Sequence, residues 1–82
     1  MEGDLQLVFG RNVRAHRESL GYSQEAFADE IGVHRTYLGG VERGERNLTL
    51  RSVERIAEWL DVDPLELLTE PPKRTSSRRT KR

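Results

Sequence analysis

Hydrophobic residues in this chain recur three and four positions apart, which is the spacing of an amphipathic α-helix. In the first such segment, charged side chains separate the apolar ones, which are Leu5, Phe9, Val13 and Leu20. This spacing places the apolar residues on one side of a helix. The first predicted element is therefore a helix over residues 4–20.

Two shorter helices are predicted next, joined by a turn. Ser23 is a typical N-cap with an acidic residue in the turn that follows, so we expect a helix from about residue 24 to 31. Gly32 permits a sharp turn, after which a third helix is expected over about residues 34–42. Two short helices joined by a turn with a glycine are typical of a helix-turn-helix.

The rest of the sequence predicts two more helices and a polar end. Thr49 is a candidate N-cap for a fourth helix. Its apolar residues repeat at three and four positions, and they are Val53, Ile56, Ala57 and Leu60. The pair Asp63-Pro64 can open a short fifth helix that continues through Leu68. We therefore expect an all-α, five-helix domain over residues 1–70, followed by a disordered basic tail over residues 71–82.

The start of the third predicted helix carries an unusual group of polar side chains. If Leu38 and Val41, three positions apart, face the core, then Arg35, Thr36 and Tyr37 cannot all be buried. An arginine, a hydroxyl and a phenol would then project from the first turn of one helix. Such a group is suited to contacts with DNA bases, although polar residues on a surface helix can also be merely solvated.

Composition does not decide for or against DNA, but it limits other possibilities. The net charge is zero, because residues 1–70 carry eight arginines and fourteen acids (−6) while residues 71–82 carry six basic residues (+6). The chain has no cysteine, which argues against disulfides or a zinc–thiolate site. It has neither the run of about 18 apolar residues that a membrane helix needs nor a secretion signal. We expect a cytoplasmic protein without a metal, a cofactor or a small-molecule ligand.

Three short motifs frame the predicted helix-turn-helix. They are Tyr22-Ser23-Gln24-Glu25, Ile31-Gly32-Val33 and Val41-Glu42-Arg43-Gly44. In these motifs the chain resembles the lambda-repressor and Cro-like DNA-binding domains, also called XRE-type regulators. The run from Arg35 to Arg43, followed by Arg46-Asn47-Leu48-Thr49, resembles the controller proteins of restriction-modification systems. The resemblance covers about residues 8–68 and implies a helix-turn-helix transcriptional regulator.

The resemblance also implies roles for individual residues. With the third helix in the major groove, Arg35, Thr36 and Tyr37 would meet base edges, and Arg35 is the first choice because a guanidinium can span O6 and N7 of guanine. Contacts to the DNA backbone are expected from Ser23, Gln24, His34, Arg43, Arg46 and Asn47. Gln24 would in addition brace the recognition helix.

Some of these residues have competing explanations. Ser23 is better explained as a plain helix cap, and His34 could donate to a phosphate or cap the third helix. Arg46 could instead form an ion pair with Glu45. Arg17 and Glu42 match a family ion pair that ties the first helix to the end of the third, and a bidentate pair suits this structural role.

Gly39 and Gly40 depart from the family pattern. Glycine inside a helix costs about 1 kcal/mol relative to alanine, and related proteins often carry a base-reading side chain at the position of Gly40. Either the helix lies very close to the DNA at this point, or the protein reads fewer bases and relies on DNA shape.

The resemblance further implies a homodimer on palindromic DNA. The candidate interface residues lie at the end of the fourth helix and in the fifth, and they are Trp59, Val62, Leu65, Leu67 and Leu68. Trp59 and Leu67 are favoured for the interface, whereas Leu60 and Leu65 are expected in the core of the monomer. The basic tail would add sequence-independent affinity for DNA or only solubility.

Taken together, the sequence predicts a DNA-binding repressor or activator and no enzyme, because no catalytic constellation surrounds its serines. Three acids of the second helix, Glu25, Asp29 and Glu30, could contact RNA polymerase or simply be solvated. The alternative is an antitoxin-type module that binds a protein partner as well as DNA. A long apolar extension that wraps such a partner would favour this alternative, whereas the carboxyl end of this sequence is polar.

Overall fold

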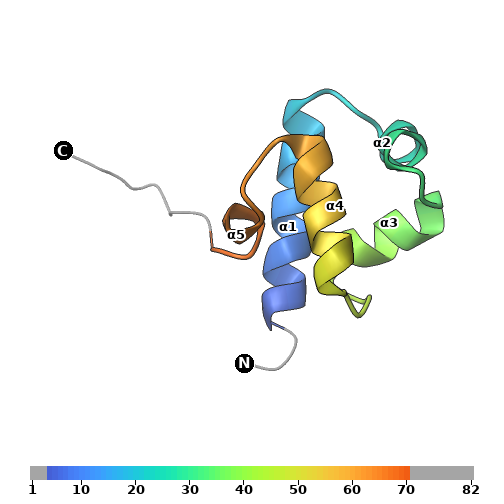
Figure 1. The fold of residues 1–82 in the computed structure, drawn as a ribbon. Helices are drawn as coiled ribbons and strands as arrows, with labels where there is room; N and C mark the ends of the chain where they lie inside the picture. The colour runs from blue at the N-terminus through green and yellow to red at the C-terminus, as the bar shows by residue number, and fades with distance from the viewer. Residues whose placement is uncertain (1–3, 71–82) are drawn as a thin grey trace.

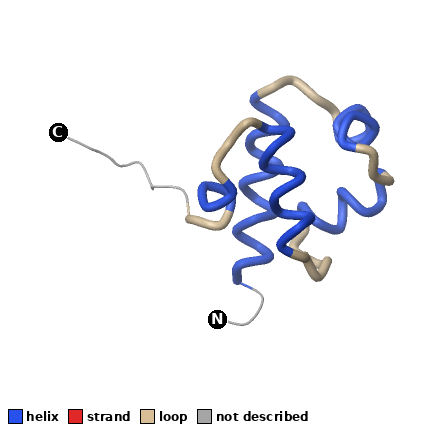
Figure 2. The backbone as a smooth tube through the Cα atoms, in the orientation of Figure 1, coloured by secondary structure: helices blue, strands red, loops and turns tan. Residues whose placement is uncertain are grey.

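The computed structural model describes residues 4–70, and the tail predicted for residues 71–82 lies outside this range. The helices are α1 (Asp4–Ser19), α2 (Gln24–Ile31), α3 (Arg35–Glu42), α4 (Leu50–Leu60) and α5 (Pro64–Leu67). Between residues 4 and 70 there is no strand (Figure 2). The prediction of an all-α, five-helix fold is therefore confirmed.

Three of the helices begin at the caps that the sequence predicts. Ser23 accepts a hydrogen bond from the Ala26 amide at 3.1 Å, and Thr49 accepts one from the Ser52 amide at 3.0 Å. Asp63 accepts one from the Leu65 amide at 2.9 Å. Each cap satisfies a backbone N–H that the helix itself leaves without a partner. This chemistry explains why these helix starts could be predicted closely.

The turn between α2 and α3 depends on Gly32. Its φ of 77° lies in the left-handed region, which a glycine adopts without the strain of a side chain. The Val33 amide then donates to the Ala28 carbonyl at 2.9 Å, which closes the end of α2. The turn lets α3 pack against both α2 and α1. In Figure 1, α2 and α3 lie on one side of the molecule and α5 on the other.

One cluster of buried side chains holds the five helices together. Every helix contributes to it, and its members are Phe9, Val13, Phe27, Ala28, Ile31, Leu38, Val41, Val53, Ile56, Ala57, Leu60 and Leu67. Their burial supplies the main favourable free energy of folding. Two residues of the predicted α1 stripe are not part of it, since Leu5 and Leu20 are 56% and 54% exposed near the two ends of the helix.

The assignment of leucines in α5 was wrong in two places. Leu67, predicted at a dimer interface, is completely buried in the monomer, and Leu65, predicted in the core, is 68% exposed. An α5 of one turn can bury only one side, and Leu65 and Leu67 point in nearly opposite directions on it. Leu60 is buried as predicted, and Leu68 and Val62 are partly buried.

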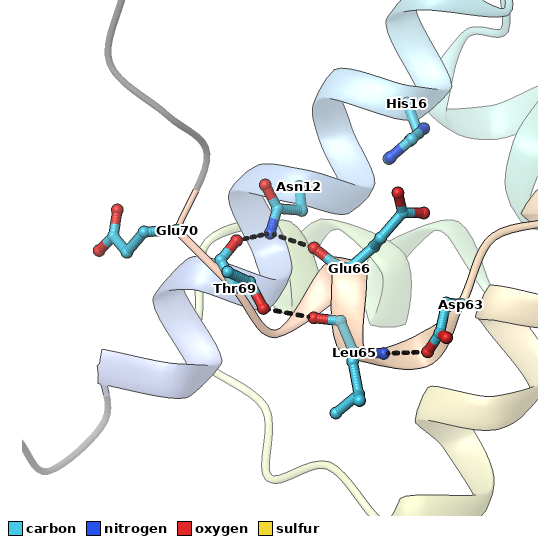
Figure 3. Close-up of a pocket in the computed structure, with 7 residues that line it drawn as sticks. All are labelled: Asn12, His16, Asp63, Leu65, Glu66, Thr69 and Glu70. Atoms are coloured by element: carbon cyan, nitrogen blue, oxygen red, sulfur yellow. Dashed lines mark hydrogen bonds between the residues drawn. The ribbon is translucent and has the colours of Figure 1, made fainter. Parts of the chain in front are cut away.

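Asn12 determines which side of α5 faces inward. Its amide nitrogen donates to the carbonyl of Leu67 at 2.9 Å. Figure 3 shows the same nitrogen between the carbonyls of Thr69, at 3.0 Å, and Glu66, at 3.3 Å. These carbonyls belong to the end of α5, where the helix leaves them without partners. A pocket between α1 and α5 lies beside this contact, and partly buried His16 stands at its border.

Trp59, which was predicted at a dimer interface, also packs against residues of its own monomer. Its ring packs edge-on against Phe27, with 5.2 Å between ring centroids, and against Tyr22, with 5.4 Å. The indole is therefore partly buried within the monomer, where edge-to-face aromatic packing is favourable.

Candidate nucleic-acid interface

The start of α3 presents polar groups to solvent. Arg35 and Thr36 are exposed, and His34 occupies the N-cap position with an extended backbone. The His34 side chain makes no capping hydrogen bond to α3, so of the two roles that the sequence left open for it, capping is not observed. The backbone N–H groups of the first turn are consequently not satisfied by this residue and attract negative charge.

Tyr37 is placed differently from its two neighbours. It is partly buried against the core, and the guanidinium carbon of Arg46 lies 5.3 Å from the centroid of its ring. This is a cation–π contact between α3 and the loop that follows it. The prediction that residues 35–37 project together is therefore accurate for Arg35 and Thr36, while Tyr37 lies beneath an arginine.

The two glycines of α3 make room for arginine side chains. A Cβ atom on Gly40 would stand 3.0 Å from Cγ and 3.1 Å from Nε of Arg46. One on Gly39 would stand 3.2 Å from Nη1 of Arg43. Neither explanation drawn from the sequence anticipated this arrangement. At Gly39 and Gly40, α3 has no side chain of its own, and two arginines from the following segment lie across these positions instead.

The opposite end of α3 is anchored by a buried ion pair. Arg17 of α1 donates to Glu42 through Nε at 2.7 Å and Nη2 at 3.0 Å, and these side chains are only 10% and 4% exposed. Gln24 of α2 donates to the same carboxylate at 2.9 Å. We call these three residues the Glu42 brace. The predicted ion pair is present, and Gln24 does brace α3.

Arg17 has further contacts that explain its tolerance of burial. Its Nη1 donates to the Tyr22 carbonyl at 2.9 Å, so both terminal nitrogens have partners. Hydrogen bonding to Glu42 raises the pKa of the Arg17 guanidinium, although burial acts in the opposite direction. Stabilisation from this shift is present below the ordinary arginine pKa and is lost only as the pH rises past the raised value.

The predicted backbone-contacting residues lie around α3 on two segments. Ser23 and Gln24 begin α2, while Arg43, Arg46 and Asn47 lie exposed in the segment between α3 and α4. Nε of Arg43 lies 3.2 Å from a carboxylate oxygen of Glu45. The ion-pair partner found for Glu45 is thus Arg43, where the sequence suggested Arg46.

Several residues that position this surface were not predicted. Gln6 of α1 donates to the Arg46 carbonyl at 2.8 Å and to Oδ1 of Asn47 at 3.0 Å. Gly10 allows α1 and α3 to cross closely, since a Cβ there would stand 2.3 Å from the Val41 carbonyl oxygen. No sequence pattern distinguished Gln6, a single polar residue near the amino end of α1. Asn12 did carry a signal, because it falls beside Phe9 and Val13 on the apolar stripe of α1.

Residues 4–70 hold neither a cluster for a metal ion nor a helix that could span a membrane. Within residues 4–70, no three histidine or acidic side chains come together in a way that could hold a metal ion. Over the same part of the chain, no helix is long and apolar enough to cross a membrane.

Comparison with known proteins identifies the family. A model described as "Helix-turn-helix" matches residues 13–67, a span that includes α2 and α3. The chain belongs to this helix-turn-helix family. It is a DNA-binding transcriptional regulator of the XRE type and not an enzyme, as predicted.

The relatives include restriction-modification controller proteins. The control protein C.BamHI of Bacillus amyloliquefaciens is 44% identical over 69 residues, which cover 83% of this chain and 85% of that protein. The crystal structure of the controller protein C.AhdI from Aeromonas hydrophila superposes with a TM-score of 0.69 at 44% identity, covering 76% of this chain and 94% of that one. The predicted similarity to controller proteins is confirmed.

A further relative has been solved with its nucleic acid. SinR, a master regulator for biofilm formation, was crystallised in complex with DNA. It superposes with a TM-score of 0.68 at 31% identity, over 74% of this chain and 98% of that one.

Proposed function

We propose that the protein binds palindromic operator DNA as a homodimer, with α3 in the major groove and Arg35 and Thr36 at base edges. The observation that carries this proposal is the contrast within α3, where a helix anchored at one end by buried contacts presents exposed Arg35 and Thr36 at the other. Side chains that contact base edges must be held in a fixed position relative to the rest of the domain, and a helix anchored in this way can do so. The likeness to SinR, which was solved in complex with DNA, supports DNA as the partner.

Backbone contacts would surround this reading surface. Arg43 and Arg46 bring positive charge beside α3 in a body of net negative charge, so DNA would be attracted locally and not by the molecule as a whole. The start of α2, with Gln24, offers backbone N–H groups to a second phosphate. Tyr37 would contact DNA from beneath Arg46 or serve only to hold that arginine.

The dimer interface is better assigned to a different set of residues from the one first predicted. Leu5, Leu50 and Leu68 border one groove of about 250 Å³, which Gln6 and Asn47 also line, and exposed Leu65 lies three residues before Leu68. Leu50 and Leu65 are 81% and 68% exposed. We call Leu5, Leu50, Leu65 and Leu68 the leucine patch and assign it to contact with a second copy. Contact of Glu25, Asp29 and Glu30 with RNA polymerase stays a prediction, and all three are exposed on α2.

Selection of bound sequences from a random duplex pool tests this proposal. The wild-type protein should enrich a palindrome whose half-sites are about one helical turn, or 34 Å, apart. Leu65→Glu, which places a charge in the leucine patch, should enrich single half-sites. A pool with no enriched sequence at moderate salt would contradict sequence-specific reading. A palindrome enriched equally by Leu65→Glu would contradict the assigned interface.

A further inference from the structure

The segment between α3 and α4, residues 43–49, accepts two hydrogen bonds from one side chain of α1. Nε2 of Gln6 donates to the Arg46 carbonyl at 2.8 Å and to Oδ1 of Asn47 at 3.0 Å. Gln6 and Arg46 are 40 residues apart in the sequence, so this contact depends on the complete fold.

These two hydrogen bonds determine the orientation of both amide groups. A backbone carbonyl only accepts hydrogen bonds, so the Gln6 atom that faces Arg46 has to be the NH2 nitrogen. The second hydrogen of that nitrogen then requires an acceptor, which is Oδ1 of Asn47. The NH2 group of Asn47 is consequently the end that points away from Gln6, and Asn47 is an exposed residue.

This orientation matches the chemistry of a DNA backbone. Phosphate diester oxygens accept hydrogen bonds and cannot donate them, so a protein must supply N–H or O–H groups. Asn47 in the opposite orientation would present a carbonyl oxygen, which phosphate repels. Gln6 thus selects the one orientation of Asn47 that is useful at a phosphate.

The same residue also holds the backbone of Arg46. While Gln6 binds the Arg46 carbonyl, the Arg46 side chain lies over Gly40 and the Tyr37 ring. Arg46 is therefore fixed at both its main chain and its side chain before any DNA is bound. Fixing such a side chain in advance lowers the entropy lost on binding.

We propose that Gln6 is a positioning residue for DNA binding, which turns the amide N–H groups of Asn47 toward phosphates and holds Arg46 against α3. The proposal rests on the proposed function only in that this segment faces DNA. Gln6 itself need not touch the nucleic acid. Its effect should be equal on any duplex, because phosphate contacts carry no sequence information.

Gln6→Met tests the proposal, because methionine keeps the length and helix propensity of glutamine but has no N–H donor. Affinity for the selected operator and for a scrambled duplex is measured for the wild type, Gln6→Met, Asn47→Ala and the double variant. Each single variant should bind both duplexes about five-fold more weakly, as expected for one lost hydrogen bond. The double variant should lose less than the product of the two losses, because Gln6 acts in part through Asn47.

The control is Ala15→Met, which puts the same side chain on the opposite, exposed face of α1 and should bind like the wild type. Thermal unfolding of all variants checks that binding is measured on folded protein. Wild-type affinity in Gln6→Met, or losses that multiply in the double variant, would overturn the proposal. A wild type without operator preference would contradict the proposed function instead, and the Gln6 comparison could still be made on the scrambled duplex.

Discussion

The two ends of α3 are held in opposite ways. At the carboxyl end, the side chain of Glu42 is 4% exposed and accepts hydrogen bonds from Arg17 of α1 and Gln24 of α2. At the amino end, Arg35 and Thr36 are exposed and His34 gives no side-chain cap. The polar groups of the first region are satisfied inside the protein, whereas those of the second are left for a partner.

This difference separates stability from recognition within a helix of eight residues. A change in the Glu42 brace removes contacts that exist in the free protein, so it should lower the free energy of unfolding. A change at the exposed end removes contacts that exist only on DNA, so it should lower affinity and leave unfolding unaltered. The predictions below test this separation.

The largest effect is expected from Glu42→Ala. The change leaves Arg17 buried without its carboxylate, and breaking a buried pair from one side costs about 3 kcal/mol or more. Urea denaturation should show this loss in the free energy of unfolding. The double variant Arg17→Met with Glu42→Ala should lose less than Glu42→Ala alone, because no unpaired charge stays buried.

Glu45→Ala is the matched control for the brace. It removes the carboxylate of the Arg43–Glu45 pair, in which both side chains are about 60% exposed. An exposed pair contributes less than about 1 kcal/mol, so the midpoint of denaturation should barely move. If Glu42→Ala and Glu45→Ala lowered the free energy of unfolding equally, burial would not be what makes the Arg17–Glu42 pair the more stabilising one.

An intermediate effect is expected at Gly10, where α1 crosses α3. A Cβ there would stand 2.3 Å and 2.7 Å from the carbonyl oxygens of Val41 and Glu42, and backbone cannot move aside as a side chain can. Gly10→Ala should therefore destabilise the protein by about 1–3 kcal/mol, seen as a lower thermal midpoint.

Gly40→Ala should have the opposite effect on stability. Its Cβ would stand 3.0 Å from Cγ of Arg46, and the Arg46 side chain would therefore have to shift by a few tenths of an ångström from its place over Tyr37. Alanine in turn favours a helix by up to about 1 kcal/mol over glycine. We expect a thermal midpoint equal to or above that of the wild type, with weaker binding to DNA because Arg46 is displaced. If Gly40→Ala is as stable as the wild type and binds DNA with the same affinity, the position of Arg46 over Gly40 has no role in binding.

Much of the fold could be predicted from local chemistry. The starts of α2, α4 and α5 follow from Ser23, Thr49 and Asp63, whose side chains cap nearby amides. The Arg17–Glu42 pair was found through the family resemblance, since nothing in the spacing of the two residues places them together. α5 was harder, because a single turn has no hydrophobic period from which to tell Leu65 from Leu67.

The candidate site could be predicted only in part. Exposed Arg35 and Thr36 follow from the helical positions of buried Leu38 and Val41. The contact of Gln6 with Asn47 joins residues that are distant in the sequence. Arg46 lies over Gly40 from a segment that has no hydrophobic period. Such contacts depend on how α1 and the segment after α3 meet in three dimensions, which no local pattern records.

The most direct test of the separation is the ratio of affinities for the selected operator and a scrambled duplex, measured in Arg35→Ala. Loss of one bidentate base contact should reduce this ratio by about ten-fold or more, with no change in the thermal midpoint because Arg35 is exposed. Arg43→Ala is the matched control, and as a backbone contact it should weaken binding to both duplexes alike and preserve the ratio. An unchanged ratio in Arg35→Ala, or a lowered thermal midpoint, would contradict the assignment of recognition to the exposed end of α3.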